Sequence, residues 1–253
     1  MKAPREDDPE RILLFGAPGS GKSTAALSIA AACPEAHILV LDTDRAYRRM
    51  LLGRDLANVH VTDGYEWPHY GAWLTSAAKD AGPGDWIVID SIDTAWDAVQ
   101  AGYIESVFGV AMDDFFLQAR KAARMQDPKG LDGWKDWSVI NRMYSAWMDR
   151  LVHGTRCHVL ATAKVDALER TDAKEAKFMF GPLGMKPKGQ KSLSHAFHSV
   201  LFLAQEQAGE FSITTAGKDR ERQRFAATPL RSFAVQYLVG KAGWTTEEGV
   251  HHA

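Results

Sequence analysis

Short runs dominated by apolar residues alternate along the chain with longer stretches in which small, apolar and polar residues mix. Such runs are typical of strands buried on both faces of a parallel sheet. They occur at Arg11–Phe15, His37–Leu41, Trp86–Ile89 and His158–Ala161. The clearest helices are predicted over Lys22–Cys33, Trp67–Lys79, Thr94–Val107 and Ser138–His153. This order of elements predicts an α/β fold with a mostly parallel central sheet and helices on both faces.

The last third of the chain has a different pattern. Two strand-like runs, His198–Gln205 and Glu210–Gly217, are separated by a short polar turn and predict a hairpin that extends the sheet with antiparallel pairing. Earlier in the chain, Asn58–Thr62 predicts an edge strand. Lys164–Ser194 is polar, contains several glycines and prolines and lacks clear periodicity, which predicts a long loop that is functional or disordered.

The chain's length and composition limit its class. With 253 residues and 45% hydrophobic residues we expect a single globular domain over residues 11–253, after a flexible lead-in of residues 1–10. Lys and Arg number 30 against 32 Asp and Glu, so the bulk charge attracts neither nucleic acid nor an anionic membrane. Cys33 and Cys157 lack metal-site spacing and suit a reducing compartment. No apolar run reaches the roughly 18 residues of a membrane span, and the acidic N-terminus differs from a signal peptide, so we expect a cytoplasmic protein without a membrane partner.

A glycine-rich motif lies between the first predicted strand and the first predicted helix. Residues 16–23 read GAPGSGKS and match G-x-x-x-x-G-K-[ST], in which backbone amides and the positive end of the helix dipole bind phosphate oxygens. Lys22 would reach the β- and γ-phosphates, and Ser23 would offer its hydroxyl to Mg²⁺, which prefers oxygen ligands. The sequence therefore predicts a nucleotide site formed by Gly16, Ala17, Pro18, Gly19, Ser20, Gly21, Lys22, Ser23 and Thr24.

Acidic residues follow two predicted strands at the sheet edge where open α/β sheets bind ligands. Asp90 closes the run WIVI and is the expected second Mg²⁺ residue; its alternative role, capping the next helix, better suits Asp93. Asp42 and Asp44 close the second strand, and we expect Asp44 to orient or deprotonate the attacking water. A turn or helix-cap role for these two acids stays open. Ser91 follows Asp90, which disfavours the ATPases that carry Asp-Glu in tandem.

Together these motifs resemble those of a known family. The segments GAPGSGKST, LDTD and IVIDS, with the late KDR of residues 218–220, resemble the RecA/RadA branch of P-loop ATPases. The chain looks most like the small phage-encoded RecA-like ATPases, a group that includes single-strand annealing proteins, and the resemblance runs from about residue 11 to 226. It implies a RecA-like core that uses ATP and Mg²⁺, hydrolyses ATP, acts on single-stranded DNA in recombination or annealing, and lies in the host cytoplasm if it is phage-encoded.

The resemblance also implies roles for individual residues. The family's second-strand acid is a catalytic carboxylate, which falls here on Asp44 and joins Lys22 and Asp90 in the catalytic set. A basic K-x-R element completes the site of a neighbouring subunit and falls on Lys218 and Arg220, so the resemblance implies a homo-oligomer, ring or filament. Such cations are worth on the order of 10³ to 10⁵ in rate. The alternative is a solvated, charged edge strand.

In this family a polar residue at the end of the next strand couples the nucleotide to DNA. Thr162 and Lys164 occupy that place instead of the usual glutamine or histidine. The polar segment after them takes the place of the family's DNA-binding loop, where lysines would neutralise phosphates and phenylalanines would stack on bases. A solvated loop with its aromatic rings packed onto the core is the alternative. The expected nucleic-acid contacts are Lys177, Phe178, Phe180, Lys186, Lys188 and Lys191.

Two other functions fit part of the pattern. A P-loop kinase for a small acceptor has the same phosphate loop and needs an arginine-rich lid, for which Arg120, Lys121 and Arg124 are candidates. The LDTD segment and the antiparallel end strands do not fit this class of kinase. A nucleotide-gated scaffold with little turnover is compatible with every motif. Residues 110–135 could form a lid, an interface or an insertion, and the sequence does not choose among these.

Overall fold

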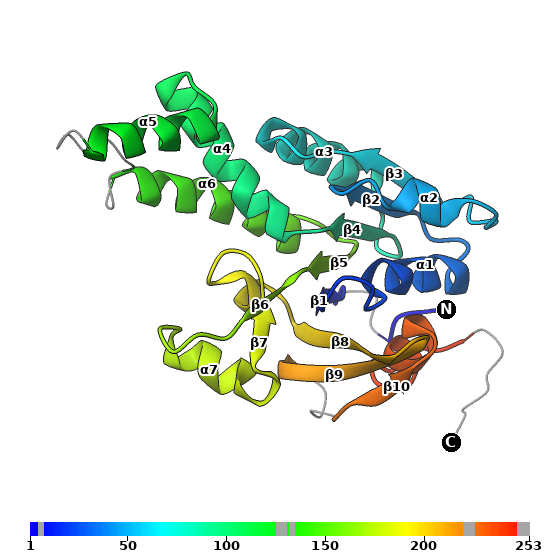
Figure 1. Ribbon diagram of the computed structural model, residues 1–253. Coiled ribbons are helices and arrows are strands. Elements are labelled where there is room, and N and C mark those ends of the chain that lie inside the picture. Colours follow the sequence, from blue (N-terminus) through cyan, green and yellow to red (C-terminus); the bar gives the residue numbers. More distant parts are fainter. Residues whose placement is uncertain (5–7, 125–130, 132–134, 220–225, 247–253) are drawn as a thin grey trace.

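The computed structural model describes residues 1–4, 8–124, 131, 135–219 and 226–246. Within these residues, eight strands form one sheet in the order β10-β9-β8-β1-β5-β4-β2-β3 (Figure 1). The strands are β1 (Arg11–Phe15), β2 (Ile38–Asp42), β3 (Val59–Asp63), β4 (Trp86–Asp90), β5 (His158–Ala163), β8 (Ser199–Gln207), β9 (Glu210–Asp219) and β10 (Thr228–Leu230).

The sheet is parallel except at one end. Strands β3, β2, β4, β5, β1 and β8 pair parallel, with β3 at the edge, as the sequence predicts. Strand β9 returns antiparallel to β8, and β10 is antiparallel to β9. The turn of this hairpin contains Gly209, whose φ of 83° lies in the left-handed region that favours glycine. The predicted fold class, with its antiparallel C-terminal extension, is confirmed.

Alternate residues of each strand enter the two halves of the core. In β1, Leu13 and Phe15 contact one cluster of buried side chains, whereas Ile12 and Leu14 contact the other. Strand residues alternate in this way because successive side chains point to opposite faces. Both faces are covered by helices, which is why the central strands β1, β4 and β5 are buried along their whole length rather than on alternate residues.

The helices on the two faces come from different parts of the chain (Figure 1). The first cluster is built from the sheet and from α3 (Trp67–Asp80), α4 (Asp93–Phe108) and α6 (Lys135–Val152). The second includes α1 (Lys22–Ala32) and the π-helix η3 (Ala234–Val239). Helix α1 directly follows the phosphate-loop motif, so the packing of α1 on the sheet fixes the end of that loop.

The segment Lys164–Ser194 differs from the long loop that the sequence predicts. It contains β6 (Val165–Ala167) and β7 (Met185–Pro187), which pair antiparallel, and the helix α7 (Lys174–Phe180). Two short 3₁₀ helices, Gly181–Leu183 and Leu193–Ala196, complete it. Its elements are only three to seven residues long, which is too short for a hydrophobic period to be visible in the sequence.

Residues 110–135 contain the helix α5 (Met112–Arg124) and the start of α6. Figure 1 shows α4, α5 and α6 side by side, extending beyond the sheet, with α5 outermost. Their place favours an interface or an insertion over a lid, since α5 packs on α4 at the far end of this group. None of the helices in the described part of the chain has the length and hydropathy that a membrane span requires.

The first residues are attached to the domain, unlike the flexible lead-in predicted over residues 1–10. Lys2 and Thr245 form an antiparallel bridge, with Lys2 N donating to Thr245 O at 2.9 Å. The N-terminal ammonium donates to Ala32 O at 3.2 Å. Residues 5–7 lie outside the described part of the chain.

Candidate functional site

The phosphate-loop motif lies between β1 and α1 with a backbone that requires its glycines. Gly19 and Gly21 have φ values of 80° and 89°, in the left-handed region. A Cβ on Gly16 would lie 2.3 Å from Leu203 O and 2.4 Å from Ser20 Oγ. The loop can therefore approach β8 closely only because residue 16 has no side chain.

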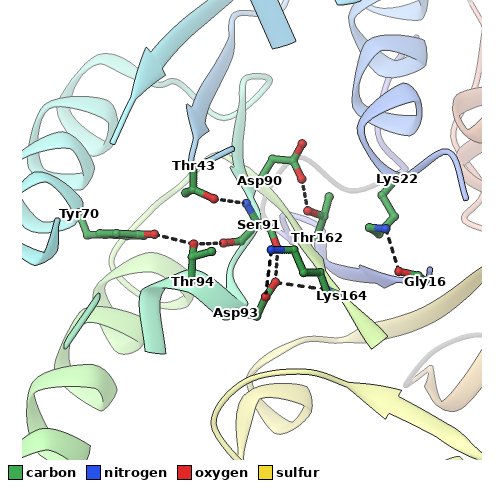
Figure 2. A network of polar contacts seen from close by, with 10 residues as sticks. All are labelled: Gly16, Lys22, Thr43, Tyr70, Asp90, Ser91, Asp93, Thr94, Thr162 and Lys164. Atoms are coloured by element: carbon green, nitrogen blue, oxygen red, sulfur yellow. Dashed lines mark hydrogen bonds and ion pairs between the residues drawn. The ribbon is translucent and has the colours of Figure 1, made fainter. Parts of the chain in front are cut away.

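Lys22, the first residue of α1, folds back over this loop. Its Nζ donates to Gly16 O at 2.8 Å (Figure 2) and also to Ala17 O at 2.9 Å. Burial lowers the pKa of Lys22, and the charges of Asp90, Asp93 and, less strongly, Asp44 oppose that change. The ammonium is thus held at the centre of the loop by two carbonyl groups that a phosphate oxygen could replace.

The loop and the end of β4 meet through one hydrogen bond. Ser23 Oγ donates to Asp90 Oδ2 at 2.6 Å. Thr162 Oγ1 donates to Asp90 Oδ1, as Figure 2 shows. Asp90 is 2% exposed, and burial raises the pKa of its carboxyl group, whereas the hydrogen bonds from Ser23 and Thr162 lower it. A hydroxyl and a carboxylate oxygen next to a phosphate loop are the donor set that Mg²⁺ prefers, so these residues fit that ion.

The two acids that follow β2 have different surroundings. Asp42 is buried, and its carboxylate accepts the backbone N–H of Ala46 at 3.3 Å and of Tyr47 at 2.9 Å. It therefore anchors the start of α2 (Tyr47–Leu51), which is the helix-cap role left open by the sequence. Burial raises the pKa of Asp42, and neighbouring Asp44 adds to this effect. Asp44 itself is exposed, and its charge acts on Lys22 and Asp90.

A polar network that the sequence does not predict surrounds Asp93. The backbone N–H of Lys164 donates to Asp93 Oδ1 at 3.2 Å, and Lys164 Nζ lies 3.9 Å from Asp93 Oδ2 (Figure 2). Ser91 Oγ donates to Asp93 Oδ1. Asp93 is 1% exposed and is the first residue of α4, with Ile92 at the N-cap, so it is not the helix cap that the sequence suggests. Ser91 directly follows β4 and Lys164 directly follows β5, so the contact with Lys164 exists only because these strands lie side by side.

The other side of this network orders the start of α4. Thr94 Oγ1 donates to Ser91 O at 2.6 Å and shares a hydrogen bond of 2.7 Å with Tyr70 Oη. Burial raises the pKa of Tyr70 to about 12, so its hydroxyl stays protonated at neutral pH. Thr43 Oγ1 accepts the N–H of Ser91 at 2.9 Å, which joins the ends of β2 and β4.

Both candidates for the coupling residue lie at the end of β5, in different surroundings. Thr162 is fully buried and contacts Asp90, the expected metal residue. Lys164 is partly exposed and contacts Asp93. The backbone N–H of Lys188 donates to Lys164 O at 2.8 Å, which holds the chain that follows β7 next to the end of β5. Thr162 is the residue directly adjacent to the nucleotide site.

Of the predicted nucleic-acid residues, one is buried and the others are exposed or partly exposed. Phe180 is 3% exposed and its ring lies 5.8 Å from that of Phe15, edge to face, so it belongs to the core and the stacking role predicted for it is wrong. Phe178 is 73% exposed. Lys186 is paired with Asp172, which leaves its charge partly neutralised. The three remaining lysines, Lys177, Lys188 and Lys191, are exposed.

The residues predicted to act in a neighbouring subunit are only partly described. Lys218 lies in β9, next to the last residue of that strand. Arg220 lies outside the described residues. The other end of β9 approaches the phosphate loop. The ring of Phe211 would lie 3.7 Å from a Cβ on Gly21.

Comparison with known proteins gives one family and one fold. A family model described as an AAA domain matches residues 8–226. No curated protein matches the chain. A crystal structure of the RadB recombinase is 14% identical and superposes with a TM-score of 0.53, covering 87% of this chain and 86% of that one. At this identity the similarity shows the fold alone, which is RecA-like.

Proposed function

The chain belongs to the AAA domain family, and on this premise we propose that it binds ATP with Mg²⁺ and hydrolyses the nucleotide. The hydrogen bond between Ser23 and Asp90 is the observation that supports this most directly. It brings the hydroxyl at the start of α1 and the carboxylate at the end of β4 together beside the phosphate loop. These groups come from distant parts of the sequence, so a chance glycine-rich turn does not explain their meeting.

Each part of the loop has a task in nucleotide binding. Its backbone amides and the N-terminus of α1 would bind the phosphate oxygens of ATP. Lys22 would exchange the carbonyls of Gly16 and Ala17 for oxygens of the β- and γ-phosphates. Ser23 and Asp90 would hold Mg²⁺, which neutralises phosphate charge. Thr162 fixes the orientation of Asp90 by its hydrogen bond.

For hydrolysis, we propose that Asp44 acts on the attacking water. Its carboxylate is exposed at the same sheet edge and interacts electrostatically with Lys22 and Asp90, whereas Asp42 is engaged by the backbone of α2. An ionised carboxylate there would orient the attacking water or accept its proton. Developing charge on the γ-phosphate would be stabilised by Lys22 and, in an oligomer, by Lys218 and Arg220 of a neighbour.

The role in the cell that we propose is action on single-stranded DNA in recombination or annealing of the phage type, in a homo-oligomer. The RecA-like fold and its similarity to a protein named as a recombinase support this. Exposed Lys177, Phe178, Lys188 and Lys191 supply the charge and the ring for binding phosphates and stacking a base. A kinase and a slowly hydrolysing scaffold would have the same phosphate loop. The products of the reaction with ATP distinguish these two functions from the one proposed here.

A phosphate-release assay tests this proposal. ATP and Mg²⁺ are incubated with the protein at several protein concentrations, with and without an oligonucleotide of single-stranded DNA, and in parallel with candidate nucleosides. We expect inorganic phosphate to form, faster per site at high protein concentration and with DNA. Transfer of the γ-phosphate to a nucleoside would show a kinase instead. A single-turnover reaction without any hydrolysis would show a scaffold.

A further inference from the structure

Helix α5 has one buried side and one exposed side. Phe115 is 8% exposed and its ring lies 4.6 Å from that of Phe108 in α4. On the other side, Phe116 and Leu117 are 44% and 56% exposed. Figure 1 places α5 at the outer end of the α4–α5–α6 group, and these two side chains are left largely uncovered by the described part of the domain. Exposed apolar side chains on an outer helix are typical of a protein interface.

The charges on the exposed side are arranged symmetrically about Leu117. Asp113 and Asp114 lie four and three positions before it, and Arg120 and Lys121 lie three and four positions after it. An α-helix turns by about 100° per residue, so these four side chains project within about 60° of the direction of Leu117. All four are exposed, and none of them forms an ion pair with another described residue.

An antiparallel copy of the same helix complements this pattern. With a twofold axis at Leu117, the helical turn before it on one copy faces the turn after it on the second copy. Asp113 then faces Arg120 of the second copy and Asp114 faces its Lys121, because these side chains project to the same side of the contact, and each pair occurs twice. A parallel arrangement would place like charges opposite each other. The two Leu117 side chains meet at the centre, where apolar contact excludes water.

We propose that the exposed side of α5 is a self-association surface, through which two copies of this chain pair by antiparallel α5 helices. The contact is isologous and closes as a dimer. It uses none of the residues of the nucleotide site, and it does not depend on the function proposed above.

Complementary charge reversal tests this pairing. The variant Asp113→Lys with Asp114→Lys has a wholly basic face, and Arg120→Glu with Lys121→Glu has a wholly acidic one. Sedimentation equilibrium without nucleotide measures their self-association over a concentration series. We expect wild-type protein to dimerise, each variant alone to dimerise at least tenfold more weakly, and an equimolar mixture to associate again, because opposite faces then meet. Circular dichroism confirms that the helices are intact.

A second variant tests the centre of the contact without changing either charge pair. Leu117→Asp places two carboxylates at the twofold axis and should weaken dimerisation at least tenfold. Its control is Leu52→Asp, at a position that is 78% exposed at the end of α2, which should leave dimerisation unchanged. Wild-type protein that stays monomeric overturns the proposal. So do reversed variants that associate as strongly as wild type, or a mixture that associates no better than its components.

Discussion

At the scale of single residues, His158 shows how burial determines protonation. Its ring is 3% exposed and lies 4.7 Å from the ring of Trp86 and 4.9 Å from that of Trp244. Nδ1 accepts the backbone N–H of Glu10 at 2.9 Å, which requires a neutral ring. Desolvation, with the nearby charge of Arg11, lowers the pKa of His158 to about 4. The start of β5 is therefore stable only while this imidazole is unprotonated.

This burial predicts a stability that depends on pH. An unfolded chain protonates the imidazole near its ordinary pKa of about 6.5, whereas the folded chain resists protonation until about pH 4. Stability is fully present above the higher value and falls as the pH drops between the two, by up to about 3 kcal/mol. His158→Gln, which can still accept the N–H of Glu10, should flatten this part of the pH dependence. Urea unfolding of both proteins between pH 4 and 7 measures it, and parallel curves would contradict the prediction.

At the scale of elements, close contact with β8 fixes the position of the loop between β1 and α1. Gly16 approaches the backbone carbonyl of Leu203 in β8, and that carbonyl cannot move without shifting the strand. Gly71 in α3 is the opposite case, since a Cβ there would meet nothing within 4 Å. The same substitution at the two positions should therefore have opposite effects.

Gly16→Ala should destabilise the fold by on the order of 1–3 kcal/mol and weaken nucleotide binding, because the loop must move away from β8. Gly71→Ala should stabilise it by about 0.5–1 kcal/mol, since alanine is favoured inside a helix and the site is open. Thermal unfolding and titration with an ATP analogue check both variants. Equal stability of the two would show that the contact with Leu203 does not constrain the loop.

Elements also show what the sequence could predict. Strands β1, β2, β4 and β5 and helix α1 were predictable because the apolar runs of these strands are continuous and the phosphate motif lies between β1 and α1. The pairing of β6 with β7 was not, because each has three residues and the partners are 20 positions apart on average. Phe180 could not be assigned to the core either, since its burial depends on Phe15 in a strand at the other end of the chain.

At the scale of the whole molecule, the site is assembled at one sheet edge from four distant segments. The phosphate loop, Asp44, Asp90 and Thr162 follow β1, β2, β4 and β5 or lie at their ends. The sequence predicts the loop and Asp90 from contiguous motifs. It could not show that Thr162, 72 positions after Asp90, contacts that carboxylate, or that Lys164 joins Asp93, because such pairs exist only once the strands are ordered side by side.

We propose that the phosphate loop binds the triphosphate through Lys22, and the other roles proposed for the site depend on this contact. Isothermal titration with a slowly hydrolysed ATP analogue and Mg²⁺ tests this in the wild type, in Lys22→Ala, and in the control Lys79→Ala, whose side chain is exposed at the end of α3. We predict that the wild type and Lys79→Ala bind alike, and that Lys22→Ala has no measurable binding while unfolding as cooperatively as the wild type. A folded Lys22→Ala protein with wild-type affinity would contradict this role of Lys22.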